Sequence, residues 1–197
     1  MIAHVRGLIA LGLVALSGCG AAAGSSKALQ PSSPFTADDA KLFQGGIDLV
    51  GQPAGLDGRW ADDWAQDMRA RVQRSDLVAL VKVDTLRTDI TPEQHTRYWL
   101  DAEVKDVWKG TFDAHQLSLP TSQDDAGFES VDQKRNTVLN QPLIVLAKWE
   151  MQPNGQVRPR WFVTLASDEV VATVRAHLHR DTPDSNRVIE RHYTSSH

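Results

Sequence analysis

The chain has 197 residues, of which 41% are hydrophobic and 23% are charged, and its formal net charge is −4. This length and apolar content suit one domain with a buried core, because domains commonly contain about 100 to 200 residues. The mildly acidic balance argues against a dedicated nucleic-acid binder, which usually has a strongly basic surface. The mixed composition also excludes collagen-like and coiled-coil chains.

Residues 1–18 have the three-part layout of a secretory leader. Arg6 and the amino terminus supply positive charge, and an apolar run follows from Gly7 to Leu16. At about 1.5 Å per residue this run covers about half of a hydrocarbon core of roughly 30 Å, so it is too short for a permanent membrane span. We therefore expect residues 1–18 to be removed as a signal peptide.

The end of this leader, Leu16-Ser17-Gly18-Cys19, resembles the lipobox of bacterial lipoproteins. The resemblance implies that Cys19, the only cysteine of the chain, carries lipid and becomes the first residue of the mature protein. Two acyl chains are enough to hold a protein stably on a bilayer. The expected location is the bacterial cell envelope, and Gly20, where Asp would favour inner-membrane retention, favours the outer membrane.

Composition divides the rest of the chain into three parts. Residues 20–34 are small, polar and punctuated by proline, so residues 19–34 are expected to form the lipidated cysteine and a flexible tether. Residues 35–180 carry the apolar patterns of a single globular domain. Residues 181–197 are polar and are expected to be a disordered tail.

Helical signals occur on both sides of the domain. Thr36 is a good N-cap for a short helix over residues 36–43, and a second helix is expected over 59–74. Ser167 is the expected N-cap of a last helix, which ends near His179. In the second helix an apolar stripe recurs at every fourth position, which predicts one buried face: Trp60, Trp64, Met68 and Val72.

Between the second and last helices the pattern predicts five strands, over residues 77–86, 96–108, 115–119, 143–149 and 157–165. The fourth is almost continuously apolar and should be central, whereas Pro159 places the fifth at an edge or a bulge. The expected fold is α+β: a five-stranded antiparallel OB-like barrel or sheet, preceded by two helices and followed by one.

Two segments, Ser75-Asp76-Leu77-Val78 and Glu103–Gly110, resemble the netrin-like and metalloproteinase-inhibitor superfamily. The resemblance implies an OB-like barrel and allows an inhibitor-like or accessory factor of an envelope hydrolase. The chain departs from that superfamily because its single cysteine, Cys19, is expected to carry lipid, so it has neither the free N-terminal cysteine nor the disulfides of the inhibitors. Metal chelation by a free N-terminal cysteine is therefore not implied.

Catalytic and metal-binding motifs are not apparent. The chain has neither a Gly-x-Ser-x-Gly elbow nor a glycine-rich phosphate loop. His177 and His179 lie two positions apart on a helix, about 200° around its axis, and cannot face one metal ion. Asp124 and Asp125 are interpreted as part of a solvated acidic loop. We expect no catalytic residue, metal or cofactor; a hydrolase with an unrecognised carboxylate site is the alternative.

Three residues are candidates for binding a partner: Trp99, Arg158 and Arg160. Trp99 has the strand parity of Asp101, opposite the apolar face, and an outward tryptophan favours a protein or glycan contact. Arg158 and Arg160 resemble the aromatic and basic surfaces with which some OB-folds hold single-stranded nucleic acid. The extracytoplasmic location and the net acidity argue against nucleic acid. We expect a non-enzymatic module that binds another envelope protein.

Overall fold

The computed structural model describes residues 29–181, so the leader, Cys19 and nearly all of the C-terminal tail lie outside the described residues. The described chain contains the helices α1 Ala37–Leu42, α2 Arg59–Arg74, α3 Phe128–Lys134 and α4 Asp168–Asp181, with one turn of 3-10 helix, η1 Pro53–Gly55. Its strands are β1 Gly46–Asp48, β2 Leu77–Ile90, β3 Thr96–Lys109, β4 Gln116–Ser122, β5 Pro142–Met151 and β6 Val157–Leu165.

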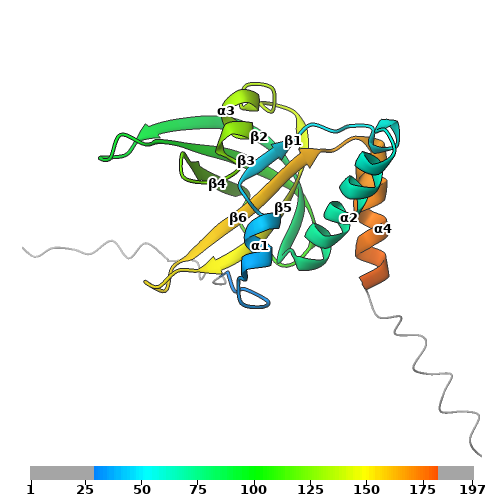
Figure 1. Cartoon of the computed structure of the whole chain (residues 1–197). Helices are drawn as coiled ribbons and strands as arrows, with labels where there is room; N and C mark the ends of the chain where they lie inside the picture. Colours follow the sequence, from blue (N-terminus) through cyan, green and yellow to red (C-terminus); the bar gives the residue numbers. More distant parts are fainter. Residues whose placement is uncertain (1–28, 182–197) are drawn as a thin grey trace, which may run out of the picture.

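The strands form one six-stranded sheet in the order β1-β6-β5-β2-β3-β4 (Figure 1). β1 is parallel to β6, whereas every other neighbouring pair is antiparallel. The α+β class is confirmed, but the expectation of five antiparallel strands is wrong, because the sheet is mixed and curls into a half-barrel. β1 has only three residues, too few for a hydrophobic period to identify a strand.

The five expected strands occur close to their predicted ranges. β2 and β3 each have 14 residues and form a hairpin longer than expected, while β5 lies in the interior of the sheet as its apolar run predicts. Helix α3 was not expected, because the segment that leads into it, at Asp124 and Asp125, was interpreted as a solvated acidic loop. No helix within residues 29–181 is long and apolar enough to cross a membrane.

Strand β5 takes part in two hydrophobic cores, one on each of its faces. Leu143 and Val145 point into the half-barrel, where they pack with residues of β2, β3, β4 and β6. Ile144 and Leu146 point to the other face, where α2 and α4 cover the sheet (Figure 1). All four side chains are fully buried.

The apolar stripe of α2 is only partly buried. Met68 and Val72 are buried in the core beneath the helices, and Trp64 is half-buried with its indole N–H donating to Asp48 Oδ2 at 2.8 Å. Trp60, which the stripe predicts to be buried, is instead 66% exposed. The first turn of α2 lies beside η1 rather than over the sheet, so the stripe extends past its packing partners.

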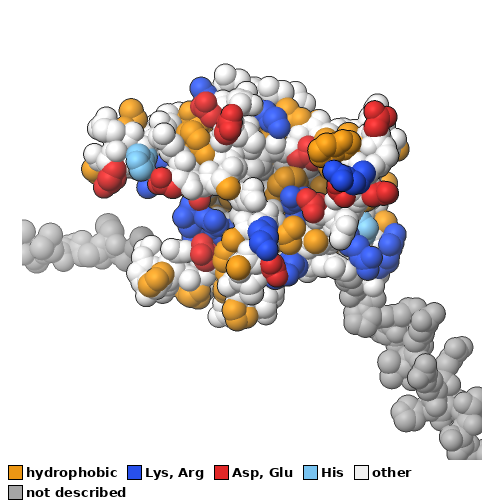
Figure 2. All heavy atoms as spheres, viewed as in Figure 1, with side chains coloured by type: hydrophobic (Ala, Val, Ile, Leu, Met, Phe, Trp, Pro, Cys, Tyr) orange, Lys and Arg blue, Asp and Glu red, His pale blue; other side chains and the backbone are white. Residues whose placement is uncertain are grey.

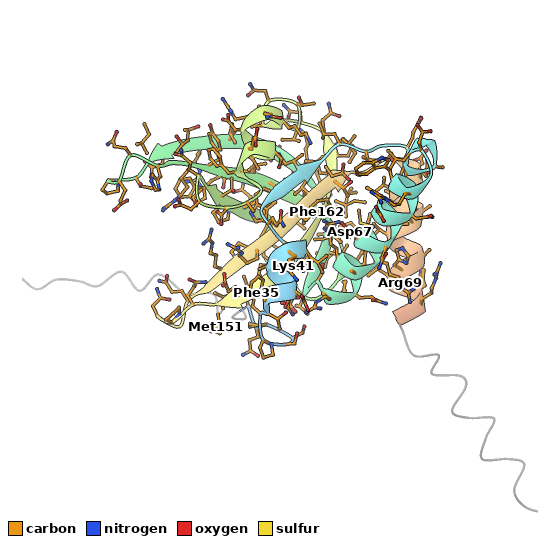
Figure 3. The ribbon with its side chains drawn as sticks, viewed as in Figure 1. Phe35, Lys41, Asp67, Arg69, Met151 and Phe162 are labelled. Atoms are coloured by element: carbon orange, nitrogen blue, oxygen red, sulfur yellow. The ribbon has the colours of Figure 1, made fainter. Side chains whose placement is uncertain are left out.

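The second half of α2 is held against the sheet by a stacked arginine. The Arg71 guanidinium lies 3.9 Å from the centre of the Phe162 ring, which lies between β6 and the helices (Figure 3). Arg71 Nε also donates to Leu42 O at 3.0 Å and so joins α2 to α1. Burial lowers the pKa of Arg71, although Asp67 and Asp48 oppose that effect.

A buried ion pair connects the sheet to the segment before α1. Lys148 Nζ lies 2.9 Å from Asp76 Oδ1, and both side chains are at most 2% exposed. Ser33 Oγ accepts from Lys148 at 2.9 Å, Ser32 N donates to Asp76 Oδ1 at 3.0 Å, and Trp149 N donates to Asp76 Oδ2 at 2.8 Å. Residues 32 and 33, which composition assigns to the tether, therefore contribute polar partners to an interior charge pair.

The two segments that carry the superfamily resemblance meet at the same end of the sheet. Val78 pairs with Lys109 in the β2–β3 ladder. Lys109 Nζ donates to Val72 O and to the carbonyl of Gln73, both at 2.8 Å, and so caps the C-terminal end of α2. Gly110 follows with φ +86, a left-handed conformation that glycine adopts without strain.

Candidate binding cleft

The half-barrel is open between β4 and β6, and a cleft follows this opening. The β2–β3 hairpin bounds one side and the β5–β6 hairpin the other (Figure 1), and the space between them has a volume of about 530 Å³. We call it the seam cleft. Its lining residues come from β3 and β4 (Arg97, Trp99, Pro120, Thr121 and Ser122) and from the β5–β6 hairpin (Gln152, Asn154, Gln156, Val157, Arg158 and Pro159).

Trp99 lies on the outer face of β3, as its parity predicts. Its neighbours Tyr98 and Leu100 are buried in the half-barrel, whereas Trp99 and Asp101 are half-buried on the opposite face. The guanidinium groups of Arg87 and Arg97 lie 5.4 and 5.3 Å from the centre of its ring. The indole is therefore a partly exposed surface beside two cationic groups, which is cation–π geometry.

Arg87 is fixed by a salt bridge with Asp101. Its Nη2 donates to Asp101 Oδ1 at 2.9 Å, and its Nε donates to the other carboxylate oxygen. These hydrogen bonds lower the pKa of Asp101, against the opposing effect of its partial burial. In contrast, Arg97 forms no salt bridge within 4 Å among the described residues; it lines the cleft, and its charge adds to the backbone hydrogen bond that lowers the pKa of Glu93.

Asp125 joins the two sides of the opening. Arg158 Nη2 lies 3.0 Å from Asp125 Oδ2, and Arg160 Nη1 lies 3.0 Å from Asp125 Oδ1. Ser122 N donates to the same carboxylate at 2.8 Å. The interpretation of residues 124 and 125 as a solvated loop is therefore wrong for Asp125, whose side chain is only 11% exposed, because two arginines of β6 face it. Asp124 remains exposed.

The structure separates the two candidate arginines. Arg158 lines the seam cleft together with Trp99, and its side chain is 35% exposed. Arg160 lies behind it: its Nε is buried without a hydrogen bond among the described residues and has Glu150 Oε2 at 3.8 Å. Of the three predicted residues, two share the cleft, and Arg160 is linked to it through Asp125.

Two prolines stand on the strands that face each other across the cleft, Pro120 on β4 and Pro159 on β6. Pro120 O accepts a hydrogen bond of 2.7 Å from Trp161 Nε1, which bridges β4 and β6. Thr121 Oγ1, beside this bridge, is buried and has no hydrogen-bond partner among the described residues. Pattern reasoning could not identify these cleft residues, since β4 and β6 are not sheet neighbours and meet only because the sheet curls.

A second cavity, of about 360 Å³, lies at the mouth of the half-barrel. It is mostly apolar, and its walls include Leu29, Phe112, Leu117, Trp149 and Pro159. Pro159 also lines the seam cleft, so the two spaces are neighbours. The seam cleft differs in carrying arginines, whereas the charged residue of the second cavity is Asp113.

The side chains that line the seam cleft offer mainly hydrogen-bond donors and one aromatic ring. Guanidinium, amide and indole N–H groups donate hydrogen bonds, and arginine binds carboxylates with charge-assisted bonds. Within residues 29–181 no group of three or more His, Cys, Asp or Glu side chains is arranged to hold a metal ion. No protein-family model, curated protein or solved structure matches this chain.

Proposed function

We propose that this protein is a lipid-anchored module of the bacterial cell envelope that binds another envelope protein through the seam cleft. The observation that carries the proposal is the placement of Trp99 and Arg158 in one cleft; Trp99 was predicted from its strand parity and Arg158 from its resemblance to aromatic and basic OB-fold surfaces. Tryptophan and arginine are among the residues most enriched at the energetic centres of protein interfaces.

The anchor rests on the lipobox-like segment that ends at Cys19. A lipid on this cysteine would keep the domain at a membrane surface, where a cleft has repeated encounters with other membrane-bound proteins. The proposed location is the outer membrane. For the fold, we propose a relationship to OB-like barrels, which the curled sheet and the meeting of residues 75–78 with Lys109 and Gly110 support.

The anchor is tested by metabolic labelling with palmitate in cells that produce the full chain. We expect label in the wild-type protein and none in Cys19→Ser. Partitioning into the detergent phase should be lost together with the label. Label retained by Cys19→Ser would contradict lipidation at this residue.

The interaction is tested by crosslinking in cells with a photoreactive amino acid in place of Gln156, which lines the seam cleft. The matched control carries the same group in place of Gln66, which is exposed on α2. We expect a discrete protein adduct from position 156 and none of the same mass from position 66. Equal adduct patterns, or no adduct at either position, would contradict the proposed role of the cleft.

A further inference from the structure

We propose that the seam cleft recognises an acidic segment of its partner protein, and that it holds this segment through side chains rather than as an added β-strand. This inference rests on the proposed function and specifies the partner's chemistry. Two independent features of the cleft support it. The first is the charge of its lining residues, and the second is the small number of backbone N–H and C=O groups that remain available for hydrogen bonds along its two edges.

The charged residues that line the cleft are both positive, Arg97 and Arg158. Arg160 lies directly behind them, and three carboxylates lie near these arginines: Asp125, Glu150 and Glu93, of which Glu93 interacts electrostatically with Arg97. Asp125 is shared by two of the arginines. In the described chain Arg158 bonds Asp125 through Nη2 alone, although a guanidinium has five N–H donors. Basic side chains gather in the hollow between the two hairpins (Figure 2).

Arg97 is the more available cation of the cleft, because it packs on Trp99 and forms no salt bridge within 4 Å among the described residues, whereas Arg158 is paired with Asp125; Glu93 interacts with Arg97 only at longer range. A carboxylate that reaches Arg97 and Arg158 together would gain charge-assisted hydrogen bonds without first breaking a salt bridge of Arg97. The amide side chains of Gln152 and Gln156 on the opposite wall can bond the peptide groups of the same segment.

The backbone along β4 is poorly suited to strand addition. Gln123 N donates to Thr96 O at 3.0 Å, so the odd-numbered residues of β4 point their backbone groups toward β3 and the even-numbered ones point into the opening. Among the latter, Pro120 has no N–H, its carbonyl is occupied by Trp161, and the N–H of Ser122 is bonded to Asp125.

The backbone groups along β6 are also poorly suited to strand addition. Gln152 N donates to Gln156 O at 2.8 Å, so the odd-numbered residues of β6 turn their backbone groups away from β5. Pro159 is one of these residues and again has no N–H, while Trp161 O accepts from Gly45 N at 2.8 Å. Since strand addition depends on a row of available backbone groups, a partner at this cleft must be recognised by side chains.

The cleft suits an acidic polypeptide better than a nucleic acid or a sugar. Nucleic-acid binding requires several phosphates to be neutralised, and this chain is acidic overall. A sugar would need an open indole face, whereas the Trp99 ring already has two guanidinium groups within 5.4 Å of its centre. Tryptophan and arginine are both enriched at protein interfaces, and arginine binds carboxylates through charge-assisted hydrogen bonds.

The test uses the photoreactive group at position 156 in the full lipidated chain, with mass spectrometry of the adduct. We expect crosslinked partner peptides that contain an excess of Asp and Glu. Arg97→Glu should lower the adduct yield at least about fivefold, Arg97→Lys should retain most of it, and Arg69→Glu on α2 should leave it unchanged (Figure 3). Arg97 is preferred to Arg158 because it holds no carboxylate of the fold.

The possible outcomes separate this inference from the proposed function. Protein adducts whose crosslinked peptides are neutral or basic, or a yield that Arg97→Glu does not change, would overturn the acidic segment and leave the interaction standing. A saccharide adduct, or no protein adduct, would overturn both. Replacing Pro159 with Val restores a backbone N–H, so an increased yield in that variant would show strand addition and contradict recognition by side chains.

Discussion

The carbonyl oxygen of Asp76 lies where a side chain at Gly110 would begin: a Cβ on Gly110 would stand 2.0 Å from it. The position of a Cβ is fixed by the backbone, and the oxygen it would meet is a backbone atom, so no side-chain rotation can relieve the clash. The close approach brings the end of β3 against the start of β2, beside the buried pair of Asp76 and Lys148.

Gly110→Ala should therefore lower the free energy of unfolding by about 3 kcal/mol or more, because a left-handed conformation and a steric clash are added together. Gly155 is the matched control, since it also has a positive φ, +78, but has open space around its Cβ position. Gly155→Ala should lower the free energy of unfolding only by the cost of the left-handed conformation, about 1 to 2 kcal/mol. Equal losses in urea denaturation of the two variants would show that the Gly110 contact is not restrictive.

Trp60 and Trp64 occupy the same predicted stripe but differ in burial. Trp64→Ala should cost about 2 to 3 kcal/mol, below the range for a fully buried aromatic residue, because the ring is half-buried and its hydrogen bond to Asp48 is lost. Trp60→Ala should change stability by less than about 0.5 kcal/mol. Chemical denaturation of both variants tests this ranking, and a larger loss at Trp60 would reverse it.

Asp39 makes the stability of the domain sensitive to acid. Burial alone would raise the pKa of this carboxyl, but hydrogen bonds from Arg74 and Thr36 outweigh it and hold the pKa below its ordinary value. A lowered pKa in the folded state means that ionised Asp39 stabilises the fold above the unfolded pKa, about 3.9, and that this contribution is lost as the pH falls through the folded pKa.

Asp39→Asn should therefore cost about 1 to 2 kcal/mol at pH 7, since the cap of α1 and a charged bond to Arg74 are weakened. The difference from wild type should shrink as the pH is lowered to 3. Urea denaturation at the two pH values measures it. The neighbouring exposed acid Asp38 is the control, and Asp38→Asn should have little effect. A loss at Asp39 that is the same at both pH values would disprove the assignment.

The pair of Asp76 and Lys148 should be costly to break and less costly to replace. Lys148→Met leaves an uncompensated carboxylate in the interior and should cost about 3 to 5 kcal/mol. The double variant Asp76→Asn with Lys148→Met removes both charges and should recover part of this loss. If the double variant is less stable than Lys148→Met alone, the unpaired carboxylate is not the cause of the stability lost in the single variant.

The same ion pair predicts how the chain enters the domain. Because Ser32 N donates to Asp76 Oδ1, the amide of Ser32 should be protected from hydrogen exchange. Lys148→Met, which also removes the hydrogen bond to Ser33 Oγ, should reduce that protection more than the protection of the β2–β3 ladder. Exchange at Ser32 as fast as in an unstructured peptide would contradict its docking.

Local patterns allowed most elements to be predicted, whereas long-range geometry did not follow from them. The apolar run of β5 and the alternation around Trp99 depend on side chains within one strand; the first indicated the interior position of β5 in the sheet, and the second indicated the outer face for Trp99. Trp60 lies outside the core because the sheet does not extend under the first turn of α2. The periodicity of a helix sequence does not indicate how far a sheet extends beneath that helix. The seam cleft depends on the curl of the sheet, and Arg158 and Trp99 meet only after that curl has formed.

Strand β5 has a further consequence, for the way the domain unfolds. Its alternating residues form part of the wall of both cores, so the helices cannot detach from Ile144 and Leu146 without exposing the strand that also closes the half-barrel over Leu143 and Val145. Neither core is a separable unit. Melting followed by tryptophan fluorescence and by far-ultraviolet circular dichroism should therefore give coincident curves, as a single cooperative transition requires.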